Sequence, residues 1–154
     1  MGLPRALAFY DLFPFWRAFF RHLDMDVVLS DATNPRIVRA TAQCAAAETC
    51  FPVKLAFGHV MDLLAKDVHF VFLPSVVDRE DPSPGQPHSH HCPLVAASPH
   101  MVRAHVDVEA RGARLVTFPF HLRERGLRRR ELRPAAAALG VPLHRALSAA
   151  ACGD

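Results

Sequence analysis

The sequence predicts an α/β domain built around a short, mostly parallel sheet. Short apolar segments rich in β-branched and aromatic residues alternate along the chain with amphipathic segments of helical period. Residues 68–73 are almost continuously apolar, which is typical of a central strand covered on both faces. Pro35 and Pro52 mark the starts of two helices, because a proline in the first turn gives up only an amide that would be unpaired.

The 154 residues are 51% hydrophobic, which is enough for the core of one domain covering residues 1–154. No apolar run approaches the roughly 20 residues of a membrane span, and no signal-peptide pattern opens the chain. We therefore expect a cytoplasmic protein without a membrane partner. The net charge of +3 comes mostly from arginines near the C-terminal end and does not favour a nucleic-acid surface.

The first half of the chain predicts one strand and three helices before the central strand. Residues 2–7, with a glycine and a proline, read as a turn after a strand rather than as a strand. Helices are expected over residues 14–23, with an aromatic stripe that packs in the core, over residues 35–45, and from residue 52 to about residue 66. Residues 26–30 form a strand candidate between the first two of these helices.

The second half continues the alternation. The central strand stops at Pro74-Ser75, residues 78–87 read as an exposed loop, and residues 94–97 form a short strand candidate. Ser98 caps a further helix that Pro99 opens and that continues to about residue 110, and residues 114–118 form another strand. From residue 123 to residue 154 the chain becomes a basic and alanine-rich helical tail.

Cys50 lies just before the helix that starts at Pro52. The positive end of that helix, with Lys54 about one turn in, favours a thiolate, which can ligate a metal ion. The alternative is a cysteine that packs as a small hydrophobic residue, and Cys44 has the same alternative. Ser75 follows the central strand, where open α/β sheets hold their ligands. His59 is expected to be a packed or hydrogen-bonded residue rather than a ligand.

Imidazoles and a thiol cluster after the exposed loop, at His88, His90, His91 and Cys92. Zinc accepts both donor types, but neighbouring residues do not easily converge on one tetrahedral ion. A zinc site on Cys92 with His88 or His90 and a solvated loop are both open. The four cysteines (Cys44, Cys50, Cys92, Cys152) favour free thiols or metal ligands over disulfides. Nucleotide-binding glycine motifs are absent from the sequence.

Several motifs, in this order, resemble one known family. The chain is similar to the acyl-CoA dehydratase activase-related domain in the motifs Gly2-Leu3-Pro4-Arg5-Ala6-Leu7, Tyr10, Pro14-Phe15-Trp16, Phe19-Phe20, Val27-Val28-Leu29-Ser30, Thr49-Cys50-Phe51-Pro52-Val53-Lys54, Gly58-His59-Val60, Phe72-Leu73-Pro74, Cys92-Pro93 and Phe118-Pro119-Phe120. The resemblance covers residues 2–120, and the chain looks like a truncated copy of the family domain. It implies a Rossmann-like fold of three layers.

The resemblance also implies a function. Related domains accompany the ATP-dependent activator of 2-hydroxyacyl-CoA dehydratases, so the expected partners are a dehydratase or that activator, and the expected role is low-potential electron transfer through a 4Fe-4S iron-sulfur cluster. The matching cysteines are Cys50 and Cys92, while a third family cysteine is Ser75 here, and a serine oxygen is a poorer donor to iron.

With two matching cysteines, a cluster needs further ligands. Ser75, a histidine of the tract at residues 88–91, Cys44 or a second subunit in a homodimer would have to supply them. The alternative function is a binding or scaffold module that has lost its cluster and docks on a dehydratase or activator partner. ATP hydrolysis is not carried over, because the activator's nucleotide-binding motifs do not occur in this sequence.

Overall fold

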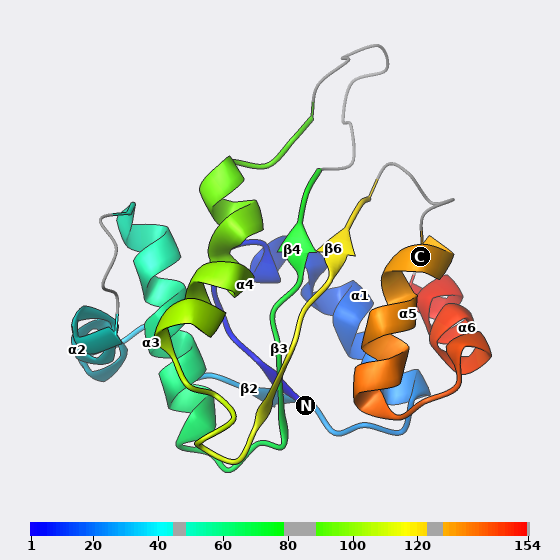
Figure 1. The fold of residues 1–154 in the computed structure, drawn as a ribbon, viewed down its shortest axis with the longest axis horizontal. Coiled ribbons are helices and arrows are strands. Elements are labelled where there is room, and N and C mark those ends of the chain that lie inside the picture. Colours follow the sequence, from blue (N-terminus) through cyan, green and yellow to red (C-terminus); the bar gives the residue numbers. More distant parts are fainter. Residues whose placement is uncertain (45–48, 79–88, 123–127, 154) are drawn as a thin grey trace.

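A computed structural model describes residues 1–44, 49–78, 89–122 and 128–153 (Figure 1). It confirms the α/β fold with a short, mostly parallel sheet in a Rossmann-like arrangement of three layers. The elements in chain order are β1 (Gly2–Leu3), α1 (Phe9–His22), β2 (Val28–Leu29), α2 (Pro35–Cys44), α3 (Phe51–Leu64), β3 (Phe70–Phe72), β4 (Ser75–Val76), α4 (Pro93–His105), β5 (Arg114–Val116), β6 (Pro119–Phe120), α5 (Arg128–Leu139) and α6 (Leu143–Gly153).

The main sheet has four parallel strands in the order β2-β1-β3-β5. Beyond it, β4 and β6 pair in parallel and continue the paths of β3 and β5 toward the upper end of Figure 1. Backbone hydrogen bonds join the two sheets. Leu73 N donates to Val116 O over 3.0 Å, and Ser75 N donates to Phe118 O over 2.9 Å. The central strands therefore project beyond β1 and β2.

The alternation of side chains in β3 divides the core into two clusters. Phe72 faces the side covered by α1, α5 and α6, whereas Val71 faces the side covered by α3 and α4. The near-continuous apolar run predicted this double coverage, because parallel strands bury both faces under their crossover helices. On the first side, the Trp16 ring of α1 packs against the rings of Phe72 and Phe120, at centroid distances of 4.5 and 4.8 Å.

The C-terminal helices belong to the core of this face. Alanines of α5 and α6 pack with the aromatic side chains of α1 in one cluster, and α6 lies along α1. Residues 123–127 and 154 of the predicted tail lie outside the described residues. Among the described residues, no single helix is long and apolar enough to cross a membrane, and the pair Arg129–Leu139 and Leu143–Cys152 that together reach this length is bent by 116°.

The start of the chain was predicted wrongly as a turn. Gly2 and Leu3 form β1, which lies between β2 and β3 in the sheet. A Cβ atom on Gly2 would lie 3.1 Å from the Val68 side chain and 3.2 Å from Phe70 O, so glycine allows the close approach of the following elements. The glycine that suggested a turn is thus explained by packing inside the sheet.

The strand predicted at residues 94–97 is also wrong, as is the helix start at Ser98-Pro99. These residues lie inside α4, which begins at Pro93 and ends at His105 rather than near residue 110. Pro99 has no amide to donate to Val95 O, and the Ser98 hydroxyl takes its place with a bond of 2.8 Å to that carbonyl oxygen. A proline inside a helix normally leaves one carbonyl oxygen without a donor. Here the hydroxyl of the preceding serine pairs that oxygen, so the helix continues through Pro99.

Helices α2 and α3 pack closely through Gly58. A Cβ atom at this position would lie 2.3 Å from Thr41 Oγ1 and 2.4 Å from Ile37 O, both in α2. Because the second contact is with backbone, α2 would have to move as a whole to make room.

Replacing Gly58 with Ala tests this contact, because the close packing and the helix propensity change the free energy of unfolding in opposite directions. Helix propensity alone would stabilise the protein by about 1 kcal/mol, whereas overpacking at the α2–α3 contact costs about 1–3 kcal/mol. We expect Gly58→Ala to lower the free energy of unfolding in urea. An unchanged or raised value would show that the helices do not pack this closely.

Candidate functional site

The two cysteines of the sequence prediction occupy equivalent places in the fold. Cys50 is the residue that precedes α3 and Cys92 is the one that precedes α4, and a proline lies in the first turn of each helix. Cys50 has an extended backbone, with φ −64° and ψ 148°, and Cys92 has φ −51° and ψ 132°. Neither side chain caps its helix with a hydrogen bond. Both cysteines are free and exposed. Their thiols are therefore accessible from solvent.

Both helices begin at the same end of the molecule. In Figure 1 the N-termini of α3 and α4 lie at the upper end, where β4 also ends. This follows from the topology, since α3 leads into β3 and α4 leads toward β5, so each helix starts at the carboxyl edge of the parallel sheet. Helix N-termini direct unpaired amides and partial positive charge toward this edge, which favours anionic groups there.

Ser75, the third candidate, is the first residue of β4 and is buried. Its hydroxyl donates a hydrogen bond of 2.7 Å to Ala96 O in the first turns of α4. The side chain thus ties β4 to the helix that Cys92 precedes. The hydrogen bond uses the one proton of the hydroxyl inside the fold, and a role for Ser75 as a ligand stays a prediction.

The structure does not gather a complete ligand set from the described residues. Within residues 1–44, 49–78, 89–122 and 128–153, no three His, Cys, Asp or Glu side chains lie close enough together to hold a metal ion. Of the predicted zinc ligands, His88 lies outside the described residues, and exposed His90 forms an isolated antiparallel bridge with Asp78. Cys44, at the end of α2, is half-buried and packs against the second core cluster.

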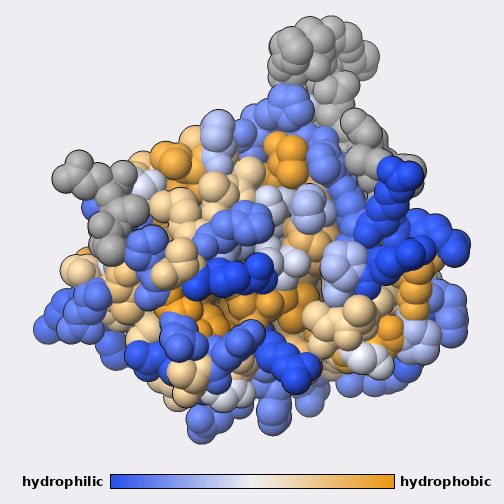
Figure 2. Space-filling model, viewed as in Figure 1, coloured by the Kyte–Doolittle hydropathy of each residue, from blue (hydrophilic) through white to orange (hydrophobic). Residues whose placement is uncertain are grey.

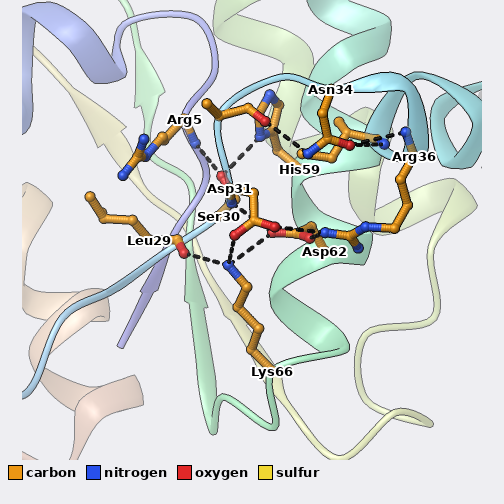
Figure 3. A network of polar contacts seen from close by, with 11 residues as sticks. Arg5, Leu29, Ser30, Asp31, Asn34, Arg36, His59, Asp62 and Lys66 are labelled. Atoms are coloured by element: carbon orange, nitrogen blue, oxygen red, sulfur yellow. Dashed lines mark hydrogen bonds and ion pairs between the residues drawn. The ribbon is translucent and has the colours of Figure 1, made fainter.

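An ionic cluster that the sequence prediction missed lies beside the β1–β2 edge (Figure 3). The Asp62 carboxylate of α3 is almost fully buried and accepts hydrogen bonds from the Asp31 amide, over 2.8 Å, and from the Arg36 guanidinium. Lys66 Nζ lies 3.2 Å from Asp62 and 2.7 Å from Asp31, and it donates to Leu29 O over 2.9 Å. The cluster joins the end of β2 and the start of α2 to the C-terminal end of α3.

These contacts govern the ionisation of Asp62. Burial alone would raise the pKa of Asp62, but the hydrogen bonds from the Asp31 amide, Arg36 and Lys66 hold this pKa below its usual value. The carboxylate therefore stays charged and fully paired. Removing one partner from such a cluster leaves a buried charge, which makes the cluster a rigid link rather than a reactive site.

His59 forms a second polar link next to this cluster. The ring is fully buried, with Nδ1 2.8 Å from Ser30 Oγ and Nε2 3.0 Å from Thr33 Oγ1. Ser30 Oγ also accepts a hydrogen bond of 2.8 Å from the Arg5 amide. The loop after β2 therefore contacts the imidazole directly, and the loop after β1 is linked to it through Ser30. The prediction that His59 is a hydrogen-bonded residue is confirmed.

The electrostatic surroundings favour the neutral form of His59. Burial lowers the pKa of His59 from its usual 6.5, the nearby Asp62 carboxylate opposes this effect, and the Arg5 guanidinium adds to it. A neutral ring donates from one nitrogen and accepts at the other, which matches the two hydroxyl partners. In sequence, the signals for this network were the polar Ser30 and Asp31 directly after a strand and the i, i+4 spacing of Asp62 and Lys66.

Comparison with known protein families gives one match over almost the entire chain. The model of a family described as a CoA enzyme activase uncharacterised domain matches residues 1–153. This match confirms the resemblance that the motifs of residues 2–120 indicated. Comparisons with curated proteins and with solved structures found no match.

The buried imidazole predicts a pH dependence of stability. Because the pKa of His59 is lowered in the folded state, the unfolded chain binds the proton more readily below about pH 6.5. The contribution of neutral His59 is fully present above that pH and is lost as the pH falls through it. We expect the free energy of unfolding, measured in urea, to fall between pH 7.5 and pH 5 in both proteins, but less steeply in His59→Gln than in the wild type. The two slopes should differ by up to about 1.4 kcal/mol per pH unit.

The matched control is His100→Gln, which removes an exposed imidazole on α4. Parallel pH profiles for wild type and His59→Gln would contradict the assignment of a buried neutral ring.

Proposed function

The chain belongs to the family of the CoA enzyme activase uncharacterised domain, and on this premise we propose that it is an accessory domain of an acyl-CoA dehydratase system. In this proposal Cys50 and Cys92 hold part of an iron-sulfur cluster of the 4Fe-4S type. A bound cluster supplies one-electron transfer at low potential. The domain would serve electron transfer to or within a dehydratase-type partner.

One observation carries this proposal: two exposed cysteines precede two helices that begin at the same end of the fold. Thiolates are the donors that iron-sulfur clusters use, and helix N-termini stabilise the net negative charge of thiolate-bound iron. Two cysteines supply half of the usual ligand set. The remaining ligands would come from a partner protein or from a second copy of this chain.

Exposed apolar side chains beside the cysteines favour a docking role for the same end. Phe51, next to Cys50, is 55% exposed, and Leu94, two residues after Cys92, is 40% exposed. In Figure 2 apolar side chains gather over the N-terminal parts of α3 and α4, whereas strongly hydrophilic side chains lie over the start of α5. Contiguous exposed apolar patches mark interaction sites, and aromatic residues are enriched in the cores of protein interfaces. The proposed partner is a dehydratase or its ATP-dependent activator.

A second candidate function is a docking module without a cluster. The hydrogen bond from Ser75 to Ala96 O favours it, because the residue in the place of the third family cysteine is engaged inside the fold. In this case the exposed apolar residues would bind the same partners, and Cys50 and Cys92 would carry no metal.

Metal analysis of protein purified and reconstituted without oxygen separates these candidates. We expect iron and acid-labile sulfide in near-equal amounts in the wild type, and loss of both in Cys50→Ser and in Cys92→Ser, because each removes a ligand. The control is Cys152→Ser, which removes an exposed thiol near the C-terminal end. Normal iron content in either site variant would contradict the cluster proposal.

The other outcomes of the same measurement point elsewhere. A stable, colourless wild-type protein without iron would contradict the cluster proposal and support the docking module. Zinc without iron would support a zinc site formed by Cys92 with His88 or His90 instead.

The docking surface has its own test. Truncation of an exposed aromatic side chain at the centre of an interface commonly costs 2 kcal/mol or more, which corresponds to a loss of affinity of about thirtyfold. We expect Phe51→Ala to weaken binding to the dehydratase or activator by about this factor, as measured by calorimetry. The control is Val38→Ala, which truncates an exposed apolar residue on α2 and should leave the affinity unchanged. Equal affinities of the two variants would argue against docking at α3.

A further inference from the structure

The strand order creates a crevice at one point of the sheet. From β1 the chain passes through α1 to β2 on one side, and it later returns through α2 and α3 to β3 on the other side of β1. The helices that follow β1 and the β3–β4 segment, α1 and α4, consequently lie on opposite faces. In open α/β sheets the carboxyl ends of two such strands diverge and leave a space in which ligands bind.

A pocket lies at this place. Its walls come from the loop after β1, with Pro4 and Leu7, from the segment that follows β3, with Leu73, and from α4, with Val95 and Ser98. The Trp16 ring of α1 also lines the space. The cavity measures about 40 Å³ and is partly open to solvent. Topology and cavity therefore indicate the same position independently of each other.

The lining of the pocket is apolar. Among the described residues that form it, only Ser98 and Trp16 have a polar side-chain atom, and the Ser98 hydroxyl already donates to Val95 O in the same helix. No side chain in the lining carries a charge. An apolar cavity does not hold ordered water, since a water molecule needs two or more polar partners. The pocket is therefore suited to a hydrocarbon group.

The loop that forms one wall is fixed in a conformation that costs energy. Leu7 has a φ of 57°, in the left-handed region that a leucine rarely adopts. Hydrogen bonds hold the loop in place, from the Arg5 amide to Ser30 Oγ over 2.8 Å and from Phe9 N to Ala6 O over 3.1 Å. Strained residues that their surroundings hold in place are concentrated at ligand sites, and the wall is preformed.

We propose that this pocket binds a short aliphatic group of a small-molecule ligand. A cavity that holds one water molecule needs about 10–15 Å³ on the same measure, so 40 Å³ accommodates about three or four carbon atoms. The site lies at the sheet edge but uses neither Cys50 nor Cys92, and it does not depend on a cluster.

Straight-chain primary alcohols from ethanol to hexanol are suitable probes, with the fluorescence of Trp16 as the readout. Trp16 is the only tryptophan of the chain and lines the pocket, so occupancy changes its surroundings. Each added methylene group should tighten binding about fourfold, because it adds buried apolar surface. We expect this increase up to about butanol and none beyond it, when the cavity is full.

Val95→Phe fills the pocket and should abolish the fluorescence response, and Ala8→Leu should do the same from the opposite wall. Val38→Phe makes the same exchange on the exposed surface of α2 and should bind like the wild type. Thermal unfolding of each variant establishes that it is folded. If one pocket variant does not fold, the other decides the result.

A response that does not depend on chain length, or wild-type binding by a folded pocket variant, would overturn the proposal. Cys50→Ser and Cys92→Ser should retain the full response. A failure of the cluster proposal therefore leaves this one unaffected, and the reverse also holds.

Discussion

Parallel pairing of β1, β3 and β5 is the constraint on which the rest of the structure depends. Parallel neighbours require a crossover after each strand, so the helices that return to the sheet begin at its carboxyl edge. This constraint places the starts of α3 and α4, and with them Cys50 and Cys92, at one end of the molecule. The apolar pocket lies at the same edge because the strand order reverses between β1 and β3.

Buried polar contacts fix the loops at this edge to the helices. His59 joins the loops after β1 and β2 to α3, and Asp62 joins the start of α2 to the same helix. Both side chains are buried and fully paired, so they resist displacement. Helix α3 is thereby held by its apolar face, by the contact at Gly58 and by two polar links. A helix held in this way keeps the position of its N-terminus, which the proposed cluster site at Cys50 would require.

The sequence predicted those features that depend on local chemistry and failed where distant contacts decide. The proline after Cys50 correctly indicated a helix start, because the preference of proline for the first turn is local. At residues 94–99 the same rule selected the wrong proline. The hydroxyl of Ser98 satisfies Val95 O inside α4, and nothing in the local pattern distinguishes this arrangement from a cap. Gly2 was predicted as part of a turn because its neighbours in α3 and β3 lie more than 60 residues away.

The sequence by itself determined the fold class, the family and the chemical types present at the candidate site. Apolar periodicity and ordered motifs are properties of the chain, and the match over residues 1–153 agrees with them. Only the tertiary structure decided that Asp62 and His59 are buried and paired, that the Ser75 hydroxyl bonds Ala96 O, and that an apolar cavity lies between β1 and β3. The physical reason is that burial, hydrogen-bond partners and cavities arise between segments far apart in the chain, and local sequence preference does not encode their distances.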